Sequence, residues 1–141
     1  MKKVFFLFSV FLVFSCANKS KLAYKQPLVE ILTQQENGGA NIRFFEIISE
    51  RAELNMLLND SNLKRKIKPN DIETSNFIVM SFGPKYKRKN EITILETNEN
   101  HNNIVISFLE SESKNAKDSL VFPIYPYTVL KINSKKEIIF K

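Results

Sequence analysis

A nearly continuous apolar run, Phe77-Ile78-Val79-Met80-Ser81-Phe82, ends abruptly at Gly83-Pro84. A short run that is apolar at almost every position is typical of a buried strand, and a glycine followed by a proline marks a break in the chain. The run therefore predicts the central strand of a sheet. From residue 76 onward the sequence predicts antiparallel β structure.

The segments that follow this strand predict further strands. Residues 91–97 alternate between apolar and polar side chains, and residues 104–109 resume the alternation after a polar turn over 98–103. Residues 128–132 and 136–140 are predicted to form a last hairpin, because only three polar residues separate these two apolar runs.

Two shorter apolar runs precede the central strand. Residues 28–34 and 42–48 are rich in bulky and β-branched side chains, and Glu36-Asn37-Gly38-Gly39 lies between them. Glycine adopts positive φ angles at little cost, so this sequence is typical of a turn. We therefore expect the two runs to pair as a hairpin.

One helix is predicted after the second of these runs, over about residues 50–59. Ser49 is suited to the N-cap, and Glu50 suits the positive end of the helix dipole. The apolar side chains that follow have the spacing of one helical stripe; they are Leu54, Leu57 and Leu58.

These elements predict a single β-rich α+β domain over residues 28–141, with about seven mostly antiparallel strands and one main helix. The chain has 141 residues, of which 43% are hydrophobic and 26% are charged. This length and composition suit one globular domain rather than two.

The N-terminus predicts where the protein resides. Met1-Lys2-Lys3 precedes an apolar run over 4–14 that is too short to span a bilayer permanently, because a spanning helix needs about 20 residues. Val13-Phe14-Ser15-Cys16 then resembles the cleavage site of a bacterial lipoprotein. The resemblance implies a signal peptide over 1–15, lipid on Cys16, and a tether over 16–27. A plain signal peptide or a short membrane anchor is the alternative.

A lipid on Cys16 would place the protein in the cell envelope, with its acyl chains buried in a membrane. Ala17 and Asn18 follow the cysteine. Neither is the aspartate that commonly marks retention at an inner membrane, so the outer membrane is expected. Removal of Lys2 and Lys3 with the signal peptide would lower the net charge from +6 to +4, a mild excess that favours contact with anionic lipid or acidic partners. Nucleic acid is not expected as a partner, because an exported protein rarely meets a genome.

The composition excludes many kinds of catalytic site. One cysteine, one histidine and three glycines leave no multi-cysteine zinc site and no glycine-rich phosphate loop. His101 lies in a polar turn, and Glu110 and Glu112 lie close together on one predicted strand. A glycosidase pair normally comes from separate segments. We therefore expect no catalytic residues, no metal and no cofactor.

Two segments are candidates for binding a partner. The first is a basic loop with one aromatic residue, made of Lys85, Tyr86, Lys87, Arg88 and Lys89. It can bind an acidic surface, or it can be a solvated turn that guards a strand edge. The second contains Tyr125 and Tyr127, which either form a binding lip or pack with only a hydroxyl at the rim.

The order of these pieces resembles the C-terminal domain family of the PrcB-type protease-complex subunits. The resemblance is carried by Ser-Glu-Arg-Ala-Glu-Leu at 49–54, Ile-x-x-x-x-Phe-x-Val at 72–79 and Pro-Tyr-x-Val at 126–129. It covers roughly residues 28–132. It implies a bacterial, lipid-anchored accessory protein that associates with a surface serine protease.

Three functions are therefore considered. The first is a non-enzymatic, lipid-anchored interaction or accessory module that supports a secreted or surface protease. The second is a protease inhibitor that uses a loop between β-strands, over residues 83–90. The third is an envelope hydrolase, for which the sequence supplies the fewest of the required groups.

Overall fold

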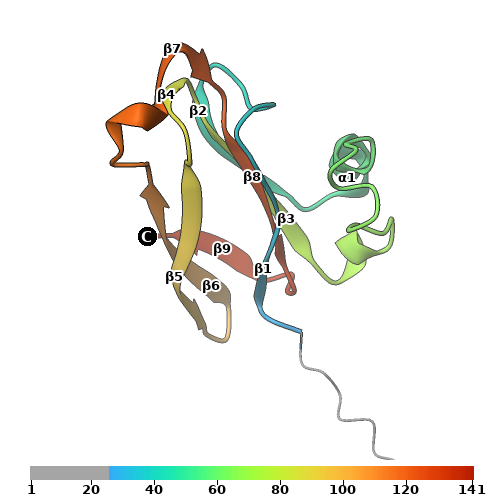
Figure 1. Ribbon diagram of the computed structural model, residues 1–141. Coiled ribbons are helices and arrows are strands. Elements are labelled where there is room, and N and C mark those ends of the chain that lie inside the picture. Colours follow the sequence, from blue (N-terminus) through green and yellow to red (C-terminus); the bar gives the residue numbers. More distant parts are fainter. Residues whose placement is uncertain (1–25) are drawn as a thin grey trace, which may run out of the picture.

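The computed structural model describes residues 26–141, and over these residues the protein is a β-rich α+β domain (Figure 1). The predicted fold class is confirmed. The described residues contain nine strands rather than about seven, together with one α-helix and two short 3₁₀ helices. In chain order the elements are β1 (Val29–Gln35), β2 (Arg43–Ile48), α1 (Arg51–Leu58), η1 (Asp71–Glu73), β3 (Asn76–Phe82), β4 (Lys85–Lys87), β5 (Glu91–Glu99), β6 (Asn103–Ser111), η2 (Ala116–Asp118), β7 (Ser119–Ile124), β8 (Tyr127–Ile132) and β9 (Glu137–Phe140).

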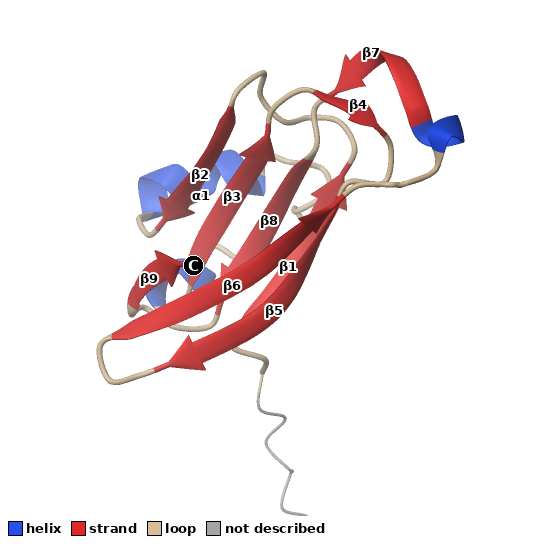
Figure 2. Cartoon of the chain, turned by 90° about the vertical axis from the view of Figure 1, so that its left-hand side faces the viewer, coloured by secondary structure: helices blue, strands red, loops and turns tan. Residues whose placement is uncertain are grey.

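The strands form three sheets (Figure 2). A four-stranded antiparallel sheet has the order β1-β8-β3-β2, and a three-stranded sheet has the order β5-β6-β9. Strands β4 and β7 form a separate two-stranded antiparallel sheet. Each larger sheet therefore ends in edge strands: β1 and β2 in one, β5 and β9 in the other.

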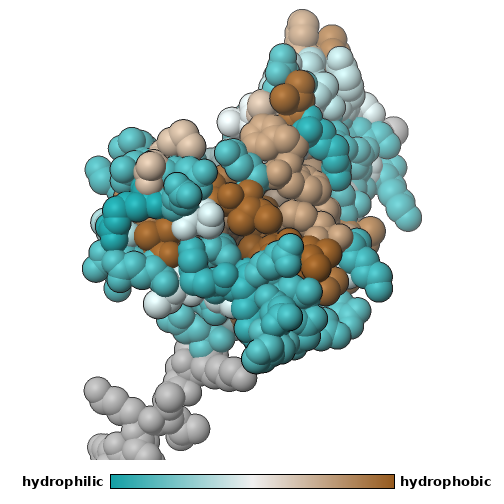
Figure 3. Space-filling view, turned by 180° about the vertical axis from the view of Figure 1, so that it is seen from behind, coloured by the Kyte–Doolittle hydropathy of each residue, from teal (hydrophilic) through white to brown (hydrophobic). Residues whose placement is uncertain are grey.

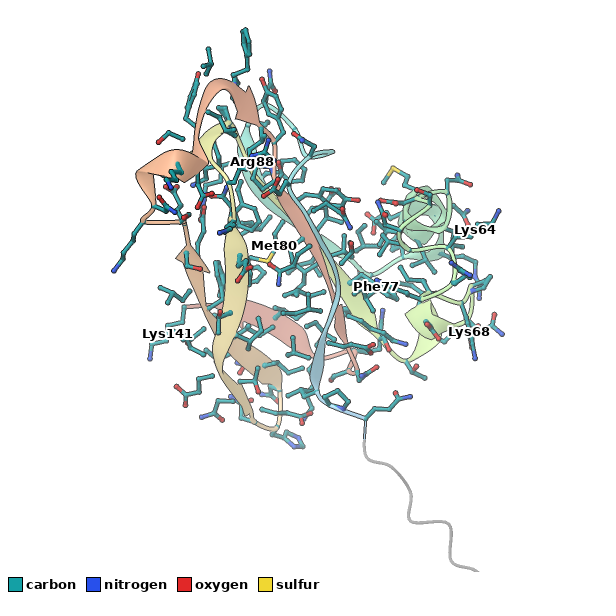
Figure 4. All side chains as sticks on the ribbon, in the orientation of Figure 1. Lys64, Lys68, Phe77, Met80, Arg88 and Lys141 are labelled. Carbon is teal, nitrogen blue, oxygen red and sulfur yellow. The ribbon has the colours of Figure 1, made fainter. Side chains whose placement is uncertain are left out.

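The core lies on both faces of the four-stranded sheet. Phe77 of β3 points toward α1, whereas Met80 of the same strand points toward the three-stranded sheet (Figure 4). Both side chains are fully buried. Burial on both faces explains why β3 is apolar at almost every position, and the prediction of a central strand at residues 77–82 is confirmed.

The helix packs through the predicted stripe, in which Leu54 and Leu57 are buried and Leu58 is partly buried. Its N-cap is Glu50, so the prediction of Ser49 at that position is wrong. The carboxylate of Glu53 accepts the backbone N–H groups of Ser49 at 3.2 Å and Glu50 at 3.3 Å. Glu53 is the third helical residue, and its carboxylate binds back to the backbone of the N-cap. This arrangement places the N-cap at Glu50, one residue after the predicted Ser49.

Two predicted hairpins are wrong, although the strands themselves are present. Strands β1 and β2 do not pair; β1 pairs with β8 and β2 with β3. Strand β8 likewise does not pair with β9, which runs parallel to β6 instead. Strand β8 is buried along almost its whole length, so it takes neighbours on both sides rather than one from its own hairpin. Strands β5 and β6, which were predicted on either side of the polar turn at 98–103, do pair as antiparallel neighbours.

The two ends of the domain carry different parts of the chain. The chain leaves the described region near the start of β1, whereas β4 and β7 lie at the opposite end (Figures 1 and 2). The predicted signal peptide, Cys16 and nearly all of the tether lie outside the described residues. Among residues 26–141, no helix is long and apolar enough to cross a bilayer.

Candidate functional site

Strands β4 and β7 form a ribbon that protrudes from the end of the domain opposite the start of β1 (Figure 1). Lys85 pairs with Ile124 and Lys87 with Ser119, with an irregularity between the two pairs. A two-stranded ribbon is at best marginally stable by itself. Its attachments to the rest of the domain therefore decide whether it is rigid enough to present a binding surface.

The first attachment is a cluster of charged side chains at the base of the ribbon, which we call the base cluster. The carboxylate of Glu110 in β6 accepts a hydrogen bond from Arg43 of β2 at 2.5 Å, and its other oxygen forms an ion pair with the ammonium of Lys85 of β4 at 2.5 Å. Lys85 also pairs with Glu112 at 3.2 Å. The base cluster joins all three sheets at one point.

The surroundings of the base cluster favour its charged forms. Burial alone would raise the pKa of Glu110, but the hydrogen bonds from Arg43 and Lys85 outweigh it and hold that pKa below its usual value. Burial likewise opposes the charge on Lys85, yet the hydrogen bonds to Glu110 and Glu112 raise the pKa of Lys85. Each group keeps its charge because its partner is present.

The second attachment holds the predicted basic loop. Arg88 pairs with Glu36 at 3.1 Å, and the same carboxylate accepts the backbone N–H of Lys89 at 3.1 Å. Lys89 has a φ of 59° and its ammonium lies 3.5 Å from Asp118. A hydrogen bond from Ser113, with Lys89 nearby, lowers the pKa of Asp118. Three of the four cations in the loop are thus paired within the protein.

This pairing changes the interpretation of the basic loop. Lys85 and Arg88 pair with acids of the rest of the domain, and Lys89 pairs with Asp118 just before β7, so all three are poor candidates for attracting an acidic partner. Lys87 makes no ion pair with a described residue, and neither do the exposed Lys114 and Lys117 near the start of β7. These three lysines carry the charge that remains available around the ribbon.

The far part of the ribbon exposes large apolar side chains, which we call the apolar tip: Tyr86, Val121 and Phe122. Val121 is 87% exposed, Phe122 is 81% exposed and Tyr86 is 58% exposed. Neighbouring residues of a strand point to opposite faces, so Val121 and Phe122 leave both faces of β7 uncovered. Apolar surface lies at this end of the molecule in Figure 3. Exposed clusters of this kind are typical of binding surfaces.

The two candidate tyrosines do not lie together on this surface. Tyr127 is 9% exposed, and its hydroxyl donates to Asp60 at 2.8 Å and accepts from Asn62 at 3.3 Å. Burial raises the pKa of Tyr127. Of the two alternatives for this residue, the structure has the one in which the ring packs in the core. Tyr125 is half-buried, and its backbone is bonded to Asn37 and Gly39.

The candidate catalytic groups are separate. His101 is exposed in the turn before β6, and Glu110 lies near the other end of that strand. A separation of nine residues along a strand corresponds to about 30 Å. Within residues 26–141, no group of three or more histidine, cysteine, aspartate or glutamate side chains is placed to hold a metal ion.

Sequence reasoning missed the residues that matter most in the ribbon. Val121 and Phe122 are not among the candidates that the sequence singles out, and Arg43 and Glu36 lie far from the basic loop in the chain. Pro123 was the available signal for β7, since proline inside a strand indicates an edge with few partners.

No family model matches the chain, and neither the curated proteins nor the solved structures contain a match to it. The resemblance to the PrcB-type family therefore rests on the sequence motifs at 49–54, 72–79 and 126–129.

Proposed function

We propose that this protein is a non-enzymatic, lipid-anchored interaction module of the cell envelope, and that the apolar tip binds a protein partner. The observation that carries the proposal is the exposure of Val121 and Phe122 on a ribbon that ion pairs hold in place. A rigid docking element loses little conformational entropy on binding, so its apolar contacts contribute more fully to affinity. The aromatic rings suit a partner interface.

The positive charge near the tip supports a partner whose binding surface is acidic at its rim. Lys87 lies in β4 and Lys114 and Lys117 lie shortly before β7, and none of the three makes an ion pair with a described residue. A complementary partner has an apolar pocket with acidic residues at its rim, because opposite charges steer association and set register. A secreted or surface protease with such a pocket is the partner that the PrcB resemblance suggests.

The direction of the ribbon supports a protein rather than the anchoring membrane. The described chain begins at the end of the domain opposite the ribbon, just before β1 (Figure 2). If acyl chains on Cys16 hold that end at the outer membrane, the apolar tip points away from the same bilayer. A lipid anchor of two or three acyl chains needs no help from the tip, because each buried CH₂ contributes about 0.8 kcal/mol.

The anchor is tested by metabolic labelling with a fatty acid analogue. We expect label on the parent chain and none on Cys16→Ser, which should also leave the membrane fraction. Absence of label on the parent chain, or unchanged label on the variant, would contradict the lipid anchor without bearing on the tip.

The tip is tested by crosslinking and affinity recovery from solubilised envelopes, followed by binding of the identified partner in purified form. Phe122→Ser should abolish recovery, and Lys87→Glu should weaken it. Met56→Ser is the matched control, because Met56 is 61% exposed on α1, away from the ribbon. Equal recovery by Phe122→Ser and the parent chain, or binding of the tip to anionic vesicles but to no protein, would sink the proposal.

A protease inhibitor is the second candidate, and one observation favours it. Phe122 stands exposed on an extended strand, which is the conformation in which a chain enters a protease cleft. The segment that the sequence predicted for this role, residues 83–90, is instead fastened by ion pairs. Inhibition of a panel of serine proteases at micromolar concentration, lost in Phe122→Ser, would favour this function over the first.

A further inference from the structure

The two larger sheets meet on one side of the domain and stay open on the other. On the closed side, the side-chain amide of Gln34 in β1 accepts the backbone N–H of Ile92 in β5 at 2.7 Å and donates to its carbonyl at 3.2 Å. This amide takes the place of a neighbouring strand at the edge of β5. On the open side lie the edge strands β2 and β9, which make no backbone pairing with each other.

An aromatic floor lies between these two open edges. The ring of Phe45 in β2 lies 5.6 Å from the ring of Phe140 in β9 and 5.4 Å from that of Phe108 in β6. All three rings remain partly exposed. Figure 3 views this side of the molecule and shows a band of apolar surface between two hydrophilic lobes. The open side is therefore an apolar surface between β2 and β9, formed by Phe45, Phe108 and Phe140, which we call the seam.

The edge of β2 has few of the features that usually protect an edge strand. Such edges carry charges that point inward, prolines or bulges. The face of β2 toward the three-stranded sheet carries Arg43, Phe45 and Ile47, and Ile47 is 38% exposed. The register of β2 with β3 is unbroken over all six residues. The backbone groups on the other side of β2 bond to no other described strand.

Arg43 gives the seam a chemical preference at one end. Its guanidinium lies over the rings of Phe45 at 5.0 Å and Phe82 at 5.6 Å, and its side chain is 49% exposed. Only one of its nitrogens donates to Glu110. A guanidinium has five N–H donors, so Arg43 can bind a second carboxylate. An open hollow lined by Arg43, Phe44 and Phe45 lies beside it.

We propose that the free edge of β2 binds an extended peptide segment of a partner protein, which adds to the four-stranded sheet as a fifth strand. Backbone hydrogen bonds to β2 supply affinity, and apolar side chains at alternate positions of the segment cover the aromatic floor. An acidic side chain of the segment pairs with Arg43. This surface is distinct from the apolar tip and does not depend on the proposed function of the tip.

The test selects peptides from a displayed random library on the full chain, purified in detergent from membranes. Enriched peptides should share alternating apolar residues and one acidic residue. In hydrogen exchange, a synthetic copy should slow the β2 amides that do not bond to β3. Replacing its acidic residue with the corresponding amide should weaken binding by severalfold.

Two variants separate this surface from the tip. Ile47→Lys places a charge in the seam and should weaken peptide binding by about tenfold or more, which corresponds to roughly 1.4 kcal/mol. Met56→Lys, which adds the same charge at an exposed position of α1, should bind as the parent does. Phe122→Ser should also bind normally, so failure of the tip and failure of the seam are distinguishable.

Three results would overturn the proposal. The first is a selection that enriches no peptide, and the second is an Ile47→Lys chain that binds the peptide as tightly as the parent. The third is a dimer by light scattering whose β2 amides are already slow without peptide, because a second copy would then occupy the edge. Hydrogen exchange on the unmodified chain decides the matter even if Ile47→Lys fails to fold.

Discussion

Strands β3 and β7 look alike in the sequence but have opposite surroundings in the fold. Both are short apolar runs, yet six of the seven residues of β3 are buried, whereas only Ile124 is buried in β7. Strand β3 has a neighbour on each side and is covered on both faces. Strand β7 has β4 alone. The number of neighbours, rather than the apolar character of the run, decides whether a strand stabilises the fold or presents a surface.

The difference between β3 and β7 is tested most directly by making the same substitution, phenylalanine to alanine, in both strands. Phe77→Ala removes a fully buried ring from the core and should lower the free energy of unfolding by about 3–5 kcal/mol. Phe122→Ala removes an 81% exposed ring and should change it by less than about 0.5 kcal/mol. Denaturant unfolding of both variants measures the difference. Similar losses in the two variants would show that β7 is buried in solution.

The stability of the ribbon should depend on the ion pairs of its base cluster, whereas the stability of β3 depends on burial. Glu110→Gln leaves Arg43 and Lys85 without their shared carboxylate, and should cost about 2 kcal/mol, because hydrogen bonds to charged groups are worth about 1.5–3 kcal/mol. The loss should appear as faster hydrogen exchange in β4 and β7.

Glu73→Gln is the matched control for Glu110→Gln, because it breaks an exposed pair with Arg51. It should cost less than about 1 kcal/mol, as exposed pairs do. If the two variants lose the same stability, the base cluster contributes no more than an ordinary surface pair.

Acid should loosen the ribbon before it loosens β3. The pKa of Glu110 is lower in the folded protein than its ordinary value of 4.5. The unfolded chain therefore binds more protons as the pH falls, so the stabilisation from Glu110 is present above about pH 4.5 and is lost as the pH falls through the folded pKa. Hydrogen exchange of β4 and β7 against pH measures the loss. The same pH dependence in Glu110→Gln would assign it to other carboxylates.

The parts of the fold that the sequence predicts are those set by neighbouring residues. The run at 77–82, the stripe of the helix and the β5–β6 hairpin follow from local periodicity and turn chemistry, and all three are present. The β1–β2 and β8–β9 hairpins were predicted from turn residues and short connections between neighbouring runs. Neither hairpin forms, because β8 pairs instead with β1 and β3, which are distant in the sequence. Between these two strands β8 has both of its edges paired and both of its faces buried.

The candidate site was predicted only in part, for a related reason. Composition locates the basic loop but not the acids that neutralise it, since Glu36 and Glu110 reach it from distant strands. Apolar character likewise does not separate Phe122 from Phe77. Whether a charge is free or a ring is covered depends on tertiary contacts, which residue type does not encode.

A smaller loss than that of Phe77→Ala or Glu110→Gln is expected at the junction of the two regions, where Gly83 connects β3 to β4. Gly83 has a φ of +69°, a conformation that costs an alanine about 1–2 kcal/mol. A Cβ atom there would also lie 3.3 Å from the backbone nitrogen of Arg43. Gly83→Ala should therefore destabilise the protein by about 1 kcal/mol in denaturant unfolding. Gly83→Asn should cost less, since asparagine tolerates this region better. Equal losses would place the cause in the contact with Arg43 rather than in the backbone angle, and the junction would then be set by packing on β2.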